Sequence, residues 1–389
     1  IDLAGNETDS ACSKMYAKVN TAFSSPAWTQ FDNGTFIDAA PSMGAKAVVS
    51  MISGPPKAIV FGGYSGTPIT NRTEFRPIGG IGSVSVYANA GGQAYASFGI
   101  ANQEDSFDFY VFGGMTQAGT LHSGANLFNK YTVNTPGATG LSTVNAPSSR
   151  SKLAMVMSAT KVCVWGGYIN NAQTTTTDDG ACYDISGDTW TTMSGSPLTV
   201  RANHVAEWVG DRMCIWGGNG DGGSPPVYDD GACYNPTGNT WNTMSASPLE
   251  GRTSHESVWT GKEMCIWGGE NAAGVSYENG ACYDPVGNTW RMIGGSPPSL
   301  GTIGFNLLWT GARMCVVGGH KKYTSNAQEA VTACWSPIYN NWQTINNTGF
   351  PASIKSTGVF IEDDICLISG YSNAATPSPV STTSCVKVR

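Results

Sequence analysis

The chain has 389 residues and a formal net charge of −7, and only 13% of its residues are charged whereas 49 are glycine. Its largest basic cluster is Lys321-Lys322, which argues against nucleic acid or an anionic membrane surface as a partner. No run of about 18 apolar residues occurs, so we expect no transmembrane helix. A start at Ile1 rather than Met is consistent with the earlier removal of a signal peptide or a larger anchor.

Residues 1–25 contain no copy of the repeat that fills the rest of the chain. The stretch 25–31 matches a later element, residues 188–193, with Trp28 in the place of its tryptophan. The final repeat ends at Arg389, before its own copy of this element. We therefore expect the strand near Trp28 to complete the last unit and close the array into a ring, because closure removes two exposed sheet edges.

Gly-Gly pairs mark a repeat that returns about every 51 residues. A period of this length accommodates four short strands and their turns. In the copy that begins at Arg201, we expect strands over 204–209, 212–217, 231–235 and 240–244. The pairs lie at 62–63, 113–114, 166–167, 217–218, 268–269 and 318–319, and Ser369-Gly370 takes the seventh place.

The clearest repeats also contain a Tyr followed by Asp or Asn and Pro, and then a Trp, as in Tyr234-Asn235-Pro236 and Trp241. Together with the Gly-Gly pair, these residues resemble the kelch motif over residues 150–345. The resemblance implies an all-β fold, a seven-bladed kelch-like β-propeller with four antiparallel strands in each blade. We expect an N-terminal extension over 1–25, followed by blades over about 44–90, 91–146, 150–193, 201–244, 252–293, 302–345 and 353–389, the last completed by residues 26–31.

Ten of the eleven cysteines form five successive pairs, one in each of the last five repeats. Four pairs are 19 positions apart and one is 17 apart, and a difference of two leaves the side chains on the same face of a strand. This parity fits disulfides between the second and third strands, with Cα atoms about 5.5–6 Å apart; reduced, buried thiols are the alternative. No Cys-x₂-Cys spacing occurs, which argues against zinc. The expected pairs are Cys163–Cys182, Cys214–Cys233, Cys265–Cys282, Cys315–Cys334 and Cys366–Cys385.

Five disulfides would require an oxidising compartment, so we expect a secreted or cell-surface protein. Cys12 has no partner within this scheme. It is a candidate for an intermolecular bridge in a self-assembled form, and a free thiol buried under the N-terminal segment is the alternative.

The loops between the second and third strands differ from repeat to repeat, whereas the first-to-second and third-to-fourth turns are short and nearly identical. In an antiparallel blade, these variable loops leave on the same face as the connections to the next blade. Variable loops on a rigid frame are common recognition sites. We expect the partner, a protein or an acidic glycan, to bind at this face.

Cationic residues recur at one position of the repeat, namely Lys46, Arg150, Arg201 and Arg252. Kelch domains that capture acidic partners often use such arginines around the mouth of the channel, so the resemblance implies a ligand-binding role and a positive rim. The alternative is a set of salt bridges between neighbouring blades, which would add little stability if they were exposed.

His204 and His255 follow two of these arginines at equivalent positions. They are candidate ligand-binding residues and could also meet as metal ligands. Other repeats carry Leu153 and Phe305 at the same position, which favours a packing role. We therefore predict no metal site and no cofactor.

No set of nucleophile and base stands out, so we assign no catalytic residue. The function predicted is non-enzymatic binding outside the cell, in adhesion or in a surface or extracellular assembly. The alternative is a carbohydrate-active kelch enzyme similar to sialic-acid mutarotase, with Glu207 or Glu256 as general acid or base. Copper radical oxidases of kelch type are disfavoured, because the chain has four His and ten committed cysteines.

Overall fold

The computed structural model describes residues 97–388 except 103–107, 117–118, 133–137, 223–224, 296, 299, 301, 321–330, 346–356, 362–363 and 369–382, together with the backbone of five short strands between 29 and 88. From residue 357 onward it describes strand backbone and a few side chains. The expectations for Cys12 and for the side chains of Trp28 and Lys46 lie outside this description. No helix in the described part is long and apolar enough to cross a membrane.

Five four-stranded antiparallel sheets follow one another between residues 99 and 345, each with its strands side by side in chain order. The expected all-β fold is therefore confirmed, and we number these sheets as blades two to six after the predicted repeats. Blade two contains β6 (Gly99–Asn102), β7 (Asp108–Phe112), β8 (Phe128–Thr132) and β9 (Thr139–Gly140), with the 3₁₀ turn η1 (Gly124–Asn126) before β8. Blade three contains β10 (Ala154–Met157), β11 (Lys161–Trp165), β12 (Gly180–Asp184) and β13 (Thr189–Thr192), and blade four contains β14 (Val205–Val209), β15 (Arg212–Trp216), β16 (Gly231–Asn235) and β17 (Thr240–Thr243). Blade five contains β18 (Thr253–Trp259), β19 (Met264–Glu270), β20 (Gly280–Asp284) and β21 (Thr289–Met292), and blade six contains β22 (Ile303–Trp309), β23 (Met314–His320), β24 (Thr332–Ser336) and β25 (Asn341–Ile345).

The backbone before and after these blades pairs in the same antiparallel way. Near the C-terminus, the strand order places β1 outermost, next to β28, with Thr29 opposite Cys385. The earlier sheet contains β2 (Lys46–Ser50), β3 (Lys57–Phe61), β4 (Arg72–Pro77) and β5 (Ser85–Ala88), and the later one contains β1 (Thr29–Gln30), β26 (Thr357–Ile361), β27 (Asp364–Ile368) and β28 (Thr383–Lys387).

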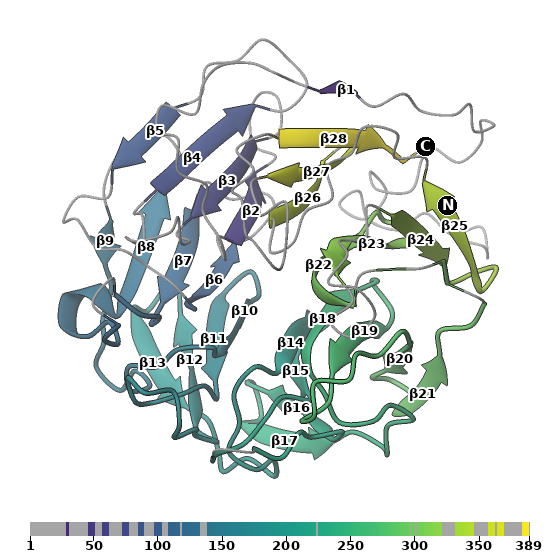
Figure 1. Ribbon diagram of the computed structural model, residues 1–389. Helices are drawn as coiled ribbons and strands as arrows, with labels where there is room; N and C mark the ends of the chain where they lie inside the picture. The colour runs from purple at the N-terminus through teal and green to yellow at the C-terminus, as the bar shows by residue number, and fades with distance from the viewer. Residues whose placement is uncertain are drawn as a thin grey trace, which may run out of the picture.

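The blades are arranged radially, with first strands such as β14, β18 and β22 near the centre and fourth strands such as β17 and β21 at the rim (Figure 1). The first strand of each blade contacts the first strand of the next, so β14 touches both β10 and β18. The second-to-third loops and the connections between blades consequently share one face of the molecule.

Blade four shows why these residues form strands and turns. Its four strands are confirmed to within one residue at each end of the predicted ranges. The turn before β17 depends on Asn235, whose side chain accepts hydrogen bonds from the backbone N–H groups of Thr237 at 2.8 Å and Gly238 at 3.3 Å. Asn239 then adopts a left-handed conformation, with φ of 49°, which an asparagine tolerates better than most residues. This turn type reverses the chain tightly and leaves the β17 edge at the rim.

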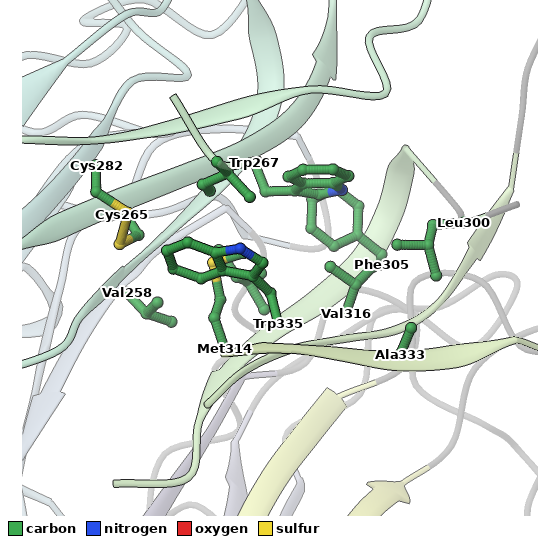
Figure 2. Close-up of a cluster of buried hydrophobic side chains, with 12 residues drawn as sticks. Val258, Cys265, Trp267, Cys282, Leu300, Phe305, Met314, Val316, Ala333 and Trp335 are labelled. Atoms are coloured by element: carbon green, nitrogen blue, oxygen red, sulfur yellow. A yellow bond between two sulfur atoms is a disulfide. The ribbon is translucent and has the colours of Figure 1, made fainter. Parts of the chain in front are cut away.

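Neighbouring blades pack through large apolar side chains from their second and third strands. Between blades five and six, Trp267 and Trp335 lie close to Met314 and Phe305, all of them buried (Figure 2). Trp267 also packs against Trp342 of blade six, with ring centroids 4.7 Å apart. Each interface therefore removes several aromatic side chains from water, at roughly 25 cal/mol per Å² of apolar surface.

The Gly-Gly pairs lie where consecutive blades approach most closely. Gly218 has a φ of 92°, and its N–H donates to the carbonyl oxygen of Arg252 in the next blade at 3.0 Å. A Cβ atom on Gly218 would lie 2.6 Å from the carbonyl oxygen of Ala202. Both the backbone angle and the space therefore require glycine at this position.

Four of the five expected disulfides are formed within the described side chains, each between the second and third strands of one blade. The backbone register also sets Cys366 opposite Cys385, although their side chains lie outside the description. The Cα atoms of each bridge are 4.0 Å apart, closer than the expected 5.5–6 Å. The reason is that the cysteines are directly opposite each other, and in antiparallel strands the narrow pairs without mutual hydrogen bonds are the closest.

Candidate functional site

Arg150, Arg201 and Arg252 precede the first strands of blades three to five, and their side chains are fully buried. Each guanidinium donates to backbone carbonyl oxygens of its own repeat. In blade four, Nε of Arg201 donates to Thr199 O at 2.9 Å and Nη1 donates to Gly217 O at 3.1 Å. The equivalent acceptors are Ser148 O and Gly166 O for Arg150, and Glu250 O and Gly268 O for Arg252.

The charge of two of these arginines is balanced by an aspartate immediately before the third strand. Nη1 of Arg201 lies 2.8 Å from Asp230 Oδ1, and Nη1 of Arg150 lies 2.8 Å from an Asp179 oxygen. Each ion pair therefore lies within one blade. The alternative prediction for these arginines placed their salt bridges between neighbouring blades. In blade five, Asn279 accepts from Arg252 in place of an aspartate, at 2.9 Å.

Sequence reasoning missed the aromatic partners of these arginines. The guanidinium of Arg201 lies 4.3 Å from the ring centre of Tyr228, and that of Arg252 lies 4.2 Å from the ring centre of Tyr277. Both tyrosines lie two residues before the acid or amide that binds the guanidinium, so their spacing was the available signal. Such stacking stabilises a cation that has lost its water.

The expected positive rim is wrong for these three arginines, because none of them reaches solvent. Burial lowers the pKa of Arg252 to about 10, which still leaves the group charged at neutral pH. Burial also lowers the pKa of Arg150, and Asp179 opposes this effect. In this structure, the arginines hold the start of the first strand, the second strand and the start of the third strand together.

His204 and His255 are buried between blades. The His204 ring packs edge-on against Trp165 with centroids 5.1 Å apart, and the His255 ring packs in the same way against Trp216 at 5.2 Å. Burial lowers the pKa of both imidazoles to about 3, and the adjacent arginines lower it further. The two histidines are therefore neutral, and the contacts support the packing interpretation.

One group of potential metal ligands occurs among the described residues, namely Glu263 with Cys265 and Cys282. The two sulfurs are bonded to each other, and the carboxylate of Glu263 binds Arg291 through both oxygens, at 2.7 and 2.5 Å. These side chains are already occupied, so the group does not fit a metal ion.

Glu207 is a half-buried carboxyl group on β14, near the centre of the molecule. The hydroxyl of Ser257 in β18 donates to its Oε1 at 2.7 Å. Burial raises the pKa of Glu207 to about 7, and the charge of Glu256 adds to this effect. The equivalent position of the first strand is Val156 in blade three and Val258 in blade five, each opposite the first cysteine of its blade. Among these three blades, blade four is therefore the one with a carboxyl group at this position.

The loop face of blades three to five has the opposite charge from the one expected. We define it as residues 166–179, 193–204, 217–230, 244–252 and 268–279, which hold the second-to-third loops and the connections between blades. Arg201 and Arg252 are the basic residues within these ranges, and both are buried. The exposed charged side chains described there are all acidic: Asp178, Asp179, Asp221, Asp229, Asp230, Glu250 and Glu278.

The sheets, the Gly-Gly contacts and the repeated Tyr and Trp positions agree with a comparison against families of known proteins. Residues 100–319, more than half of the chain, match the model of the KLHDC2/KLHL20/DRC7 Kelch-repeats domain. A search of curated proteins gave no match. The chain belongs to the KLHDC2/KLHL20/DRC7 Kelch-repeats domain family.

Proposed function

We propose that this chain is a non-enzymatic binding protein of the extracellular space, which captures a basic protein partner on its loop face. Kelch-repeat domains typically bind proteins, and the acidic loop face is the observation that carries the proposal. Adhesion or an extracellular assembly is the setting that this role fits.

We further propose that the complete chain has seven blades closed by the N-terminal strand. Two features of the backbone support closure: β26 contacts both β22 and β2, and β1 extends the sheet of β26–β28. A closed ring would hold the loops of all blades in fixed relative positions, which is the property that a binding face needs.

The extracellular location is supported by the four disulfides, because reducing compartments do not maintain such bridges. Each of these four bridges joins two strands of one blade.

Charge complementarity supports a basic partner. Asp179 and Asp230 are balanced by buried arginines, whereas Asp178 and Asp229 lie beside them and are exposed without a basic neighbour on this face. Glu250 adds a further exposed carboxylate. A surface of one sign accelerates association with a partner of the opposite sign and rejects partners of like sign.

The proposal can be tested by capture and chemical cross-linking with the secreted proteins of the source organism. In one variant, Asp178→Asn, Asp229→Asn and Glu250→Gln remove negative charge from the loop face. In the matched control, Thr237→Lys, Val286→Lys and Ile338→Lys change the net charge equally at exposed third-to-fourth turns.

The expected partner is basic, cross-links to the loop face and loses affinity in the loop variant, with a greater loss at low salt. Its binding to the turn control should be unchanged. Cross-links confined to the turns, or equal binding by both variants, would contradict the proposal.

Glu207 supports a second candidate, a carbohydrate-active enzyme. A carboxyl group with a pKa of about 7 can exchange protons at neutral pH. NMR measurement of sialic-acid anomer exchange, with wild type and with Glu207→Gln, tests it; an exchange rate equal to that of buffer would exclude this substrate.

A further inference from the structure

A cavity of about 790 Å³ lies at the outer edge of β17, and residues 194–197 are the part of the loop face that lines it. It extends from Ser194 and Ser196 across β17 to Tyr283 of blade five. Its volume is within the range of small-molecule sites, roughly 300–1,000 Å³. None of the exposed acidic residues of the loop face lines it, so this inference does not depend on the proposed partner.

Several polar groups of this cavity have no partner among the described residues. Arg212 uses its Nε to bind Asp211 at 2.7 Å, and neither of its Nη atoms makes a hydrogen bond. The side chains of Thr240 and Asn242, which lie on one face of β17, form no hydrogen bond to a described residue. The site therefore offers a guanidinium edge, an amide and a hydroxyl group.

The neighbouring blades provide internal comparisons. In blade five, the positions of Arg212 and Asn242 are taken by Glu263 and Arg291, which bind each other through two hydrogen bonds. The Arg291 guanidinium also lies 5.0 Å from the ring centre of Trp335, the equivalent of Tyr283. The polar groups are thus paired in blade five and left available in blade four.

Blade six shows the same pairing in a third form, because Arg313 binds Gln343 at the equivalent positions. In blade four, Asn242 is too short to fill the space that Arg291 fills in blade five. The unbonded Nη atoms of Arg212 therefore distinguish blade four from blades five and six.

An aromatic wall completes the cavity. Tyr283 of blade five lines it on the face of the blade-four sheet that carries Arg212 and Asn242, and its hydroxyl donates to Asn288 Oδ1 at 2.9 Å, so the ring has a fixed orientation. A fixed aromatic ring beside hydroxyl and amide groups suits a ligand with an apolar ring face and several hydroxyl groups. The guanidinium adds a preference for one carboxylate, because its planar fork matches carboxylate geometry.

We propose that this cavity binds an acidic saccharide through one carboxylated sugar unit. The carboxylate binds the Nη atoms of Arg212. The hydroxyl groups bind Asn242 and Thr240, and the sugar ring packs beside Tyr283.

The test is calorimetric titration with trigalacturonate, with the neutral trisaccharide maltotriose and the acidic peptide triglutamate as comparison probes. Trigalacturonate is expected to bind one site, and maltotriose at least about ten-fold more weakly, because it lacks the charge-assisted hydrogen bonds. Triglutamate, which lacks the hydroxyl groups, should also be weaker.

Two variants locate the site. Arg212→Gln should weaken trigalacturonate binding about ten-fold or more. The double variant Arg212→Glu with Asn242→Arg reproduces the pair of blade five and should abolish binding while the melting temperature is maintained. The loop-face variant described above should bind trigalacturonate as wild type does, which separates this site from the proposed function.

Three results would overturn the proposal: no binding of trigalacturonate at millimolar concentration, binding that survives Arg212→Gln, or equal affinity for maltotriose or triglutamate. If the double variant unfolds, Arg212→Gln decides alone, because Arg212 is only partly buried and its loss leaves the fold intact.

Discussion

At the scale of single residues, the repeated arginines bind backbone and side-chain groups within their own blades and so stabilise the fold. Arg201 replaces its lost water with Thr199 O, Gly217 O, Asp230 and the ring of Tyr228. A buried guanidinium is costly unless such partners are supplied. The repeat supplies them to Nε and Nη1, whereas Nη2 of Arg201 and of Arg252 has no hydrogen-bond partner among the described residues. The cation therefore joins three separate backbone segments of its repeat.

We expect Arg201→Ala to lower the free energy of unfolding by about 3–5 kcal/mol, because it leaves buried carbonyl groups without donors. Chemical denaturation with wild type and variant measures this. Arg212→Ala is the control, since its partly exposed side chain should contribute less than about 0.5 kcal/mol. Equal stability of Arg201→Ala and wild type would show that the guanidinium is not a structural link.

Glu207 predicts a pH dependence of stability. Its pKa is raised to about 7 in the folded protein, so folding favours the protonated form. The stability associated with it is fully present below the unfolded pKa, near 4.5, and is lost as the pH rises through 7.

Glu207→Gln should therefore match wild type near pH 4 and be more stable at pH 8, by roughly 2–3 kcal/mol. Denaturation curves between these pH values measure the difference. A constant difference across the range would mean that folding leaves the pKa of Glu207 unchanged.

At the scale of elements, each disulfide joins the second and third strands at a buried position opposite each other, as Cys214 and Cys233 are. These strands are already paired by backbone hydrogen bonds, and the loop between them is the variable one. The bridge therefore holds the blade together while the loop sequence changes.

Removing one bridge by Cys214→Ala with Cys233→Ala should cost about 3 kcal/mol, since it releases a loop with a sequence separation of 19. The thermal midpoint under non-reducing conditions measures the loss. Peptide mapping without reduction should recover each local pair, including Cys366 with Cys385; a cross-link between different blades would contradict the assignment.

At the scale of the whole molecule, the proposed closure of the ring depends on the N-terminal strand. β1 is short, and it covers the outer side of β28. An uncovered strand edge is a template for pairing with another chain.

Deletion of residues 1–31 should therefore expose β28 and produce oligomers or aggregates, visible in size-exclusion chromatography with light scattering. Deletion of residues 1–25 keeps β1 and is the matched control, which should remain monomeric. A monomeric 1–31 deletion with an unchanged melting temperature would argue against a closing role for β1.

The sequence by itself determined the repeat, the four strands in the blades with the clearest repeat motif, and the cysteine pairs. These features depend on local pattern: the strands of blade four follow from turn residues such as Asn235 and Asn239, and the opposite placement of Cys214 and Cys233 follows from the parity of their spacing. They need no knowledge of what lies in the next blade.

Only the tertiary structure decided which charged groups reach solvent. The repeat positions of Arg150, Arg201 and Arg252 predicted a binding rim. In the structure, these three side chains are buried and the acidic side chains beside them are exposed to solvent. The same holds for the cavity at β17, which exists because Asn242 is short where blade five has Arg291. Burial and vacancy depend on how side chains pack in three dimensions, and the spacing of residue types along the chain does not show this packing.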